Sequence, residues 1–398
     1  MTDAAATPID PVELTRDLIR RPSVTPADAG AMDTLERVLT GLGFTCRRMA
    51  FEGPTGQGAD ARIENLYARR GSASPNLCFA GHTDVVPTGA AEGWSADPFA
   101  AEVKDGVLYG RGAVDMKGGI AAWVAAVSRV LAEEEPEGSL SFLITGDEEG
   151  PALHGTKRVV EALMAEGEVI DACVVGEPSS QQQLGDMIKI GRRGSLNTWI
   201  TVHGKQGHVA YPDRAANPAP VLVRLLAALD AHVLDDGYEA FQPSNLEITT
   251  VDIGNPATNV IPAEAKARLN IRFNPSHTGD GLIAWLNAEA GRIQAETGLQ
   301  ISLEHMCSGE AFLTPVGPFV TAVQDAVEAE TGRRPEASTT GGTSDARFIR
   351  AMAPVLELGL VGQTMHQFDE RVPTAELEAL TCVYERVIRS VLICPPQA

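Results

Sequence analysis

The sequence predicts an α/β protein: a mixed sheet flanked by helices, interrupted by an inserted two-layer α+β unit of ferredoxin-like type. Two observations favour this fold class. Strand-like apolar runs alternate with helix-like stretches in the first part of the chain and again near its end, an order typical of open α/β sheets covered on both faces. Between these parts the order changes to strand, helix, strand, strand, helix, strand, which is typical of a ferredoxin-like insertion.

The elements of the first part follow from caps, apolar periodicity and glycine breaks. The first helix is expected after Asp10, a suitable cap residue, because Pro11 fits the first helical position and Glu13 stands three residues after the cap. A second helix is expected over 32–42 and stops at Gly43. Further helices are expected over 116–131 and 154–164, and strands over 65–68, 76–80, 106–109, 140–145 and 172–175.

The change of pattern sets the expected domain boundaries. The insertion is expected to contain strands over 197–202, 246–253, 265–273 and 300–303 and helices over 219–229 and 281–293. The α/β order resumes with a helix over 316–330, a strand over 354–358 and a closing helix over 374–392. We therefore expect one discontinuous domain, 1–185 and 305–398, interrupted by a second domain over 186–304.

The composition argues against a nucleic-acid or membrane partner. The 398 residues carry a net charge of -21, which disfavours binding to phosphate backbones and anionic membranes. The six cysteines, from Cys46 to Cys394, lie far apart without Cys-x-x-Cys spacing, so free or buried thiols in a reducing compartment are expected. No export signal is visible after Met1, and no apolar run reaches the roughly 18 residues of a membrane span. We expect a cytoplasmic protein.

Chemically useful side chains follow several of the predicted strands. His82 and Asp84 follow one strand, Glu148 and Glu149 follow another, and Glu177 follows a third. The carboxyl ends of such strands are where open α/β sheets place their ligands. Two adjacent carboxylates can divide into a base and a metal ligand, and a His-x-Asp unit can orient an imidazole.

Each of these residues alone also has an ordinary structural interpretation. His82 could be a structural histidine, Glu177 a surface acid, and the pair after the 140–145 strand a solvated loop. Asp115, in the glycine-dense loop 110–119, could cap a helix after a tight turn. The coincidence of all these residues, together with His366 after an apolar stretch, favours metal-assisted hydrolysis at two ions.

Four short motifs carry a resemblance to a known family: GHTDVVP (81–87), YGRG (109–112) with DMKGG (115–119), GDEEG (146–150) and GEP (176–178). Over nearly its whole length the chain resembles the dizinc deacylases and peptidases that include aminoacylase and acetylornithine deacetylase. The resemblance implies a dizinc catalytic domain and an inserted domain that forms a dimer and closes over the site. It also implies that the Asp115–Met116 peptide is cis.

The resemblance further implies a role for each site residue. The implied metal ligands are Asp115, bridging both ions, His82 and Glu177 on one ion, and Glu149 and His366 on the other. Glu148 is implied as the general base, and Asp84 is placed to orient His82 or to tune Glu148. Imidazole and carboxylate ligands without thiolate suit two zinc ions per subunit, which cobalt or manganese could replace.

A second set of motifs implies a narrower activity: GRRGS (191–195), GH (207–208), NVIP (259–262) and GGTSDARF (341–348). They resemble the branch of the family that hydrolyses N-succinyl-L,L-2,6-diaminopimelate to succinate and L,L-2,6-diaminopimelate, in the bacterial route to lysine. Arginine forks pair well with the carboxylates of such a substrate. The implied substrate-binding residues are Arg192, Asn259, Arg272, Gly342, Thr343 and Ser344. His208 is expected to reach across a homodimer and to stabilise the oxyanion in the neighbouring subunit.

The sequence leaves two alternatives open. A sister deacylase or carboxypeptidase, such as an acetylornithine deacetylase, would share the metal core and differ in a few side chains of the inserted domain. A non-enzymatic relative would keep the fold as a binding or dimerisation module. Such a protein is expected to have lost ligands, whereas every expected ligand is present in this chain.

Overall fold

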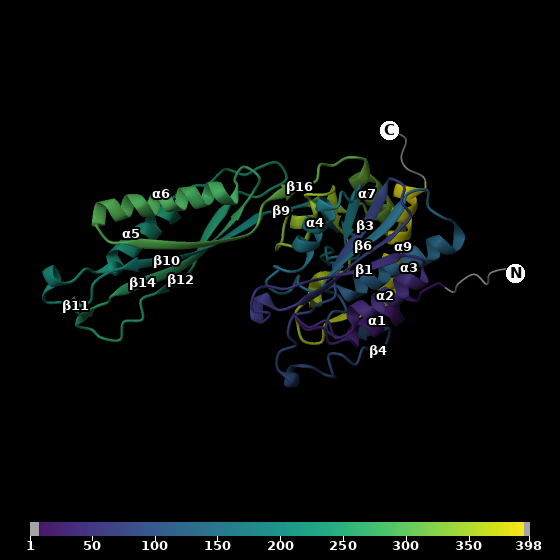
Figure 1. Cartoon of the computed structure of the whole chain (residues 1–398), viewed down its shortest axis with the longest axis horizontal. Coiled ribbons are helices and arrows are strands. Elements are labelled where there is room, and N and C mark those ends of the chain that lie inside the picture. The colour runs from purple at the N-terminus through teal and green to yellow at the C-terminus, as the bar shows by residue number, and fades with distance from the viewer. Residues whose placement is uncertain (1–7, 394–398) are drawn as a thin grey trace. The chain divides into compact units, whose positions relative to one another are not determined.

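The computed structural model describes residues 8–393, which form two compact units (Figure 1). The second unit comprises Gly191–Leu313 and Thr339–Thr343, and the first comprises the other described residues. The main divisions fall at 190/191 and 313/314, where the sequence predicted 185/186 and 304/305. Residues Thr339–Thr343, which were expected in the first domain, belong to the second unit. The N-terminal residues that were expected to lack an export signal, and Cys394, lie outside the described residues.

The first unit is built on an eight-stranded mixed sheet with the order β1-β2-β6-β3-β7-β18-β8-β17. Its strands are β1 (Thr45–Phe51), β2 (Ile63–Arg70), β3 (Asn76–His82), β6 (Ser139–Thr145), β7 (Ala172–Val175), β8 (Met187–Lys189), β17 (Glu336–Ser338) and β18 (Val355–Glu357). β3 runs parallel to β6 on one side and to β7 on the other. The carboxyl ends of these three strands therefore lie together at one edge of the sheet.

Helices flank this sheet, as the alternating pattern predicted. They are α1 (Pro11–Ile19), α2 (Ala31–Gly41), α3 (Lys117–Glu133), α4 (Thr156–Ala165), α7 (Pro318–Thr331), α8 (Ala346–Ile349) and α9 (Thr374–Leu392). α3 is buried along most of its length, because it carries small and apolar side chains all around its axis. Its Trp123 lies against Phe79 of β3 and Tyr384 of α9, with ring centroids 4.9 Å apart in both pairs, so α3 and α9 share one core with the sheet.

Two local predictions in this unit are confirmed, the Asp10 cap of α1 and the cis Asp115–Met116 peptide, and the start of α3 shows a further close contact. Asp10 caps α1, since its Oδ1 accepts hydrogen bonds from the backbone N–H groups of Val12 (2.8 Å) and Glu13 (3.2 Å). Gly119 allows close packing at the start of α3, because a Cβ at this position would lie 2.6 Å from the carbonyl oxygen of Gly176. The Asp115–Met116 peptide is cis.

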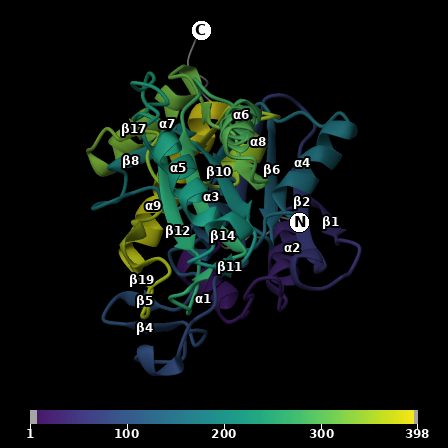
Figure 2. The same cartoon turned by 90° about the vertical axis from the view of Figure 1, so that its left-hand side faces the viewer.

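A small antiparallel sheet brings together two distant segments of the first unit. It consists of β4 (Glu102–Lys104), β5 (Val107–Tyr109) and β19 (Arg371–Pro373), which lie together at the lower left of Figure 2. Arg371 pairs with Tyr109. The segment that follows His366 is thereby held beside the loop that leads to Asp115.

The second unit has two layers. Its four-stranded antiparallel sheet has the order β12-β14-β10-β15, and helices α5 and α6 pack over one face (Figure 1). The elements are β10 (Gly194–His203), α5 (Pro218–Asp230), β12 (Asn245–Asp252), β14 (Glu264–Phe273), α6 (Gly279–Thr297) and β15 (Ile301–Gly309), with the short strands β9 (Gly191–Arg192), β11 (Gly207–His208), β13 (Val260–Ile261) and β16 (Phe312–Leu313). Alternate residues of β14 face the helices and are buried. The element order is that of the ferredoxin-like insertion expected from the sequence.

Three strands of the large sheet were not expected from the sequence: the short strands β8 and β17, and β1, the outermost strand on one side. β1 is partly exposed on both faces and carries two arginines, so its sequence lacks the alternation of a half-buried strand. Arg47 pairs with Glu166 (2.6 Å) and Arg48 with Asp33 (3.2 Å). Tertiary pairing with β2 and these ion pairs stabilise the strand instead. No helix in residues 8–393 is both long and apolar enough to span a bilayer.

Candidate metal centre

The expected ligands converge at the edge where β3, β6 and β7 end. His82 is the last residue of β3 and pairs with Thr145, the last residue of β6. Glu148 and Glu149 follow β6 by three and four residues, and Glu177 follows β7 by two. Parallel pairing thus brings together side chains from three segments that are far apart in the sequence.

Asp115 stands between the two histidines. Its Oδ1 lies 3.2 Å from His82 Nε2, and its Oδ2 lies 3.2 Å from His366 Nε2. His82 Nε2 also lies 3.6 Å from Glu177 Oε1, and His366 Nε2 lies 2.9 Å from Glu149 Oε1. The side chains therefore form two groups, one around each imidazole, with one carboxylate oxygen of Asp115 facing each group.

The ring of His82 is fixed by a backbone contact. Its Nδ1 lies 2.9 Å from the carbonyl oxygen of Asp84, and because a carbonyl oxygen can only accept, Nδ1 must carry a hydrogen. Nε2 is then the nitrogen that a metal ion can use. The ring is 1% exposed, so its orientation is also held by packing.

The side chain of Asp84 holds the two glutamates rather than His82. Its Oδ1 accepts from the backbone N–H of Glu148 (3.2 Å) and its Oδ2 from that of Glu149 (3.0 Å), whereas its distance to His82 Nδ1 is 3.6 Å. Burial raises the pKa of Asp84 to about 7, although the neighbouring imidazole and these two N–H groups oppose the shift. These contacts favour a role in which Asp84 fixes the backbone of Glu148 and Glu149 over one in which it orients His82.

Burial and mutual repulsion act on the carboxylates of the centre. Burial raises the pKa of Glu177 well above its usual value, and the negative charges of Asp115 and Glu148 raise it further. Burial also raises the pKa of Glu148 well above its usual value; the charge of His82 opposes this shift, and the negative charge of Asp345 adds to it. Such a cluster of like charges is expected where a cation compensates it.

The imidazoles respond in the opposite way. Burial alone lowers the pKa of His82, but the hydrogen bond to Asp115 and the charge of Glu177 hold it well above its usual value. Hydrogen bonds to Asp115 and Glu149 raise the pKa of His366 to about 10. The carboxylates therefore attract protons to the same nitrogen atoms that face them, which is where a divalent cation would replace the protons.

The donor set fits divalent metal ions. Among the described residues, two overlapping sets that share His82 have ligand atoms within 4.8 Å of one another. The first set is His82, Asp115 and Glu149, and the second group is His82, Glu148 and Glu177. Glu177 Oε1 is buried without a hydrogen-bond partner, as expected for an oxygen that binds a metal. All the donors are imidazole nitrogens or carboxylate oxygens, which suits zinc and related ions. Glu148, expected as the base, lies within the second group.

Glu370 was not expected from the sequence to belong to the centre. This residue is 0% exposed and accepts hydrogen bonds from the segment that precedes and includes Asp115. Its position four residues after His366 and the arginine in the YGRG motif were the available signals. An acidic residue in a polar segment is usually a surface residue, so neither signal was specific.

Two of the expected substrate-binding residues, Arg192 and Arg272, have defined surroundings within the second unit. Arg192 is 9% exposed, and its Nη1 donates to the carbonyl oxygen of Thr340 (3.0 Å). A side chain at Gly341 would collide with this guanidinium. Arg272 of β14 is partly buried, and burial, aided by the charge of Arg193, lowers its pKa. Two further expected residues of this unit, the exposed Gly342 and the partly buried Thr343, are also among the described residues.

The remaining expected residues differ in exposure. His208 is exposed in β11, and its Nδ1 accepts from the N–H of Ala210 (3.1 Å). Asn259 is exposed, and its backbone carbonyl oxygen accepts from Val209 N–H (3.1 Å). Ser344, in the first unit, is 2% exposed and donates its hydroxyl to Glu357. The structure therefore gives Ser344 an internal partner.

The mixed α/β sheet and the imidazole–carboxylate cluster at its edge define a metal-dependent hydrolase. The chain belongs to peptidase family M20/M25/M40, whose sequence profile matches residues 78–390. The chain is 66% identical over 383 residues to a succinyl-diaminopimelate desuccinylase of Caulobacter vibrioides, covering 96% of each chain. It is 63% identical to the protein of that name from Phenylobacterium zucineum, covering 96% of this chain and 98% of the relative.

Solved structures share the fold at low sequence identity. An M20 family metallo-carboxypeptidase from Sulfolobus solfataricus superimposes with a TM-score of 0.76 at 16% identity, covering 96% of this chain and 98% of the other. A protein of Bacillus subtilis described as a dinuclear metal binding peptidase from the M20 family gives a TM-score of 0.68 at 16% identity, covering 96% and 97%. These similarities establish the fold.

Proposed function

We propose that this protein hydrolyses N-succinyl-L,L-2,6-diaminopimelate to succinate and L,L-2,6-diaminopimelate, in the bacterial route to diaminopimelate and lysine. One observation carries the proposal: relatives named succinyl-diaminopimelate desuccinylase are 53–66% identical to this chain over almost its full length. The ligand cluster in the first unit supplies the chemistry that an amide hydrolase needs.

The metal centre is proposed to hold two zinc ions, which cobalt or manganese could replace. Asp115 would bridge them, with His82 and Glu177 completing one site and Glu149 and His366 the other. The chemistry that such ions supply when bound is polarisation of a carbonyl oxygen and a lowered pKa for a water molecule. Support comes from the two oxygens of Asp115, each of which faces a different imidazole.

Glu148 is the proposed general base. It removes a proton from the attacking water and delivers a proton to the nitrogen of the leaving amine. Asp84 assists by fixing the backbone of Glu148 and Glu149, so that one carboxylate serves as base and the other as ligand. The raised pKa of Glu148 favours its role as a proton acceptor that can also return the proton.

The substrate carboxylates require cationic partners in a chain of net charge -21. We infer that Arg192 and Arg272 bind them as bidentate forks. Asn259, Gly342, Thr343 and Ser344 would add neutral hydrogen bonds. Partial burial of both arginines supports this role, because a less hydrated guanidinium binds an anion more strongly.

The second unit is proposed to form a homodimer and to act as a lid. Large apolar side chains are exposed on it, as expected for an interaction surface: Trp199, Val209, Tyr211, Val223, Val233, Tyr238, Val251 and Met306. We infer that His208 stabilises the oxyanion in the neighbouring subunit's reaction. We also place the enzyme in the cytoplasm, a proposal that the free described cysteines support.

A substrate panel tests the proposed activity. The zinc-loaded protein is incubated with N-succinyl-L,L-2,6-diaminopimelate, N-acetylornithine and simple N-acetylamino acids, and release of free amine and carboxylic acid is measured. We expect kcat/KM to be highest for the succinyl substrate by at least about tenfold, a difference of about 1.4 kcal/mol. Preference for N-acetylornithine would replace the proposal with the sister deacylase activity.

A further inference from the structure

A buried carboxylate outside the expected ligand set joins two parts of the metal centre. Glu370 Oε1 accepts from the backbone N–H groups of Val114 (2.9 Å) and Asp115 (3.1 Å). Its Oε2 accepts from Gly112 N–H (3.0 Å) and from Arg111 Nη1 (2.8 Å). All four hydrogen bonds go to the segment 111–115, so one side chain fixes the backbone that ends at Asp115.

The same residue belongs to the segment that carries the second histidine ligand. His366 and Glu370 are four residues apart, and the intervening backbone is tightly turned, with positive φ at His366 (61°) and Asp369 (52°). His366 Nε2 lies 3.2 Å from Asp115 Oδ2. Glu370 itself is 0% exposed. Its hydrogen bonds therefore connect the Asp115 segment with the His366 segment in the interior of the protein.

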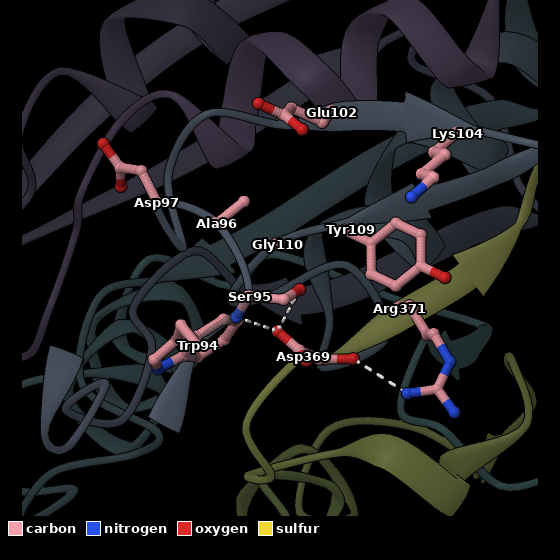
Figure 3. A pocket seen from close by; sticks show the side chains of 10 residues that line it. All are labelled: Trp94, Ser95, Ala96, Asp97, Glu102, Lys104, Tyr109, Gly110, Asp369 and Arg371. Carbon is pink, nitrogen blue, oxygen red and sulfur yellow. Dashed lines mark hydrogen bonds between the residues drawn. The ribbon is translucent and has the colours of Figure 1, made fainter. Parts of the chain in front are cut away.

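The neighbouring residue Asp369 makes exposed contacts. Figure 3 shows Asp369 at a surface pocket, where its Oδ1 accepts from the N–H (2.8 Å) and the hydroxyl (3.0 Å) of Ser95. Arg371 donates to the backbone carbonyl of Asp369 (3.1 Å). These contacts lie in solvent, where a hydrogen bond contributes little net stability. Asp369 therefore offers a natural comparison for Glu370.

Arg111 explains why the fixing group is a carboxylate. Its side chain is 3% exposed, and it also donates to the carbonyl of Gln367 (3.2 Å) and lies over the Trp94 ring at 5.2 Å. A buried guanidinium needs a negative partner, and Glu370 is that partner. Two carboxylate oxygens also accept four donors, whereas a glutamine amide would turn an NH2 group toward donors in either orientation.

We propose that Glu370 is a positioning residue of the metal centre: it holds the Asp115 segment and the His366 segment at the separation in which both side chains reach the same pair of ions. The inference rests on the proposed function, because it takes Asp115 and His366 as ligands. Loss of the carboxylate leaves buried N–H groups and Arg111 without their acceptor, so the loop rearranges and Asp115 moves. Partners behind metal ligands typically change affinity by about 10- to 100-fold.

Glu370→Gln is tested against Asp369→Asn, a neighbouring change that also removes one negative charge. Zinc affinity is measured by competition with a chromophoric chelator, and kcat and KM are measured at rising zinc concentration. We expect Glu370→Gln to weaken zinc binding by about 10- to 100-fold, with kcat partly restored by excess zinc and KM unchanged. Asp369→Asn should bind zinc like the wild type.

Equal weakening of zinc binding in both variants would mean that charge alone matters. Wild-type zinc affinity in Glu370→Gln would mean that the Glu370 hydrogen bonds do not position the ligands. Either result overturns the proposal. If Glu370→Gln does not fold, hydrogen exchange of the wild type decides. The amides of segment 111–115 should exchange slowly with and without zinc, and exchange as fast as in the exposed loop 54–57 contradicts the proposal. A wild type that binds no zinc contradicts the proposed function itself.

Discussion

At the scale of single residues, two neighbouring glutamates of the centre have different proposed roles, one as a metal ligand and one as the general base. Glu148 and Glu149 are adjacent, and Asp84 binds the backbone N–H of both. Glu149 points its Oε1 to His366 at 2.9 Å, and Glu148 belongs to the group around His82 and Glu177. A one-residue difference in the sequence thus separates a proposed ligand from a proposed base.

Replacement of either glutamate by glutamine separates these two roles. Glu148→Gln should retain the zinc content of the wild type while kcat falls by at least about 100-fold, because the proton acceptor is lost and the ligands remain. Glu149→Gln is the matched control and should lose zinc from one site. Metal analysis of the dialysed proteins, together with turnover, measures both. Wild-type turnover in Glu148→Gln would remove it as the base.

The charge balance of the centre also predicts how the zinc-free protein responds to pH. The folded-state pKa of Asp84 is raised from 3.8 to about 7, and that of His366 from 6.5 to about 10. Both groups bind more protons in the folded state, so the stability from Asp84 is full below pH 3.8 and lost through about pH 7. That from His366 is full below pH 6.5 and lost through about pH 10.

We therefore expect the free energy of unfolding of the zinc-free protein to contain a contribution that decreases between about pH 4 and 10. Zinc should remove much of this decrease, because the ions replace the protons. Urea unfolding at several pH values, with chelator and with zinc, measures the difference. Equal pH dependence in the two conditions would show that His366 does not bind the metal.

At the scale of elements, the start of α3 and the end of β7 are in direct backbone contact. A Cβ on Gly119 would lie 2.6 Å from the carbonyl oxygen of Gly176, the residue before Glu177. Glycine is therefore required at this point for packing rather than for a left-handed conformation. The close approach brings α3 against the strand whose end supplies a proposed ligand.

Gly119→Ala should destabilise the protein by about 1–3 kcal/mol, because a backbone carbonyl must move to make room. Gly41→Ala is the control. Gly41 ends α2 in the same unit, and a Cβ at this position would have no other atom within 4 Å. Its replacement should be neutral or stabilising by up to about 1 kcal/mol. Chemical denaturation of the three proteins measures the effect, and equal midpoints would contradict the close packing.

At the scale of the whole molecule, the proposed chemistry is distributed over two units. All five proposed metal ligands belong to the first unit, whereas Arg192, Arg272 and His208 belong to the second. This division follows from the sequence order, because the βαββαβ unit is inserted between Glu177 and His366. Specificity can then change in one unit while the metal chemistry of the other is kept.

Mixing two inactive variants tests the proposed homodimer. If His208 acts in the neighbouring subunit, a mixed dimer of Glu148→Gln and His208→Ala contains one site with both Glu148 and His208 intact. With equal amounts of the two variants, turnover should then rise on subunit exchange toward about a quarter of the wild-type value, because half of the dimers are mixed and each mixed dimer has one intact site. Analytical ultracentrifugation checks the dimer. A dimer without recovered turnover would place His208 in its own subunit's reaction or outside it.

The sequence by itself determined the element order, most element positions, and the side chains that end β3, β6 and β7, because caps, apolar periodicity and glycine breaks act between near neighbours. Only the tertiary structure decided that β1 is a strand, that Asp84 holds the glutamate backbone, and that Glu370 joins the Asp115 and His366 segments. The physical reason is the same in each case. These hydrogen bonds join residues up to 259 positions apart, and no local pattern records which donor will meet which acceptor.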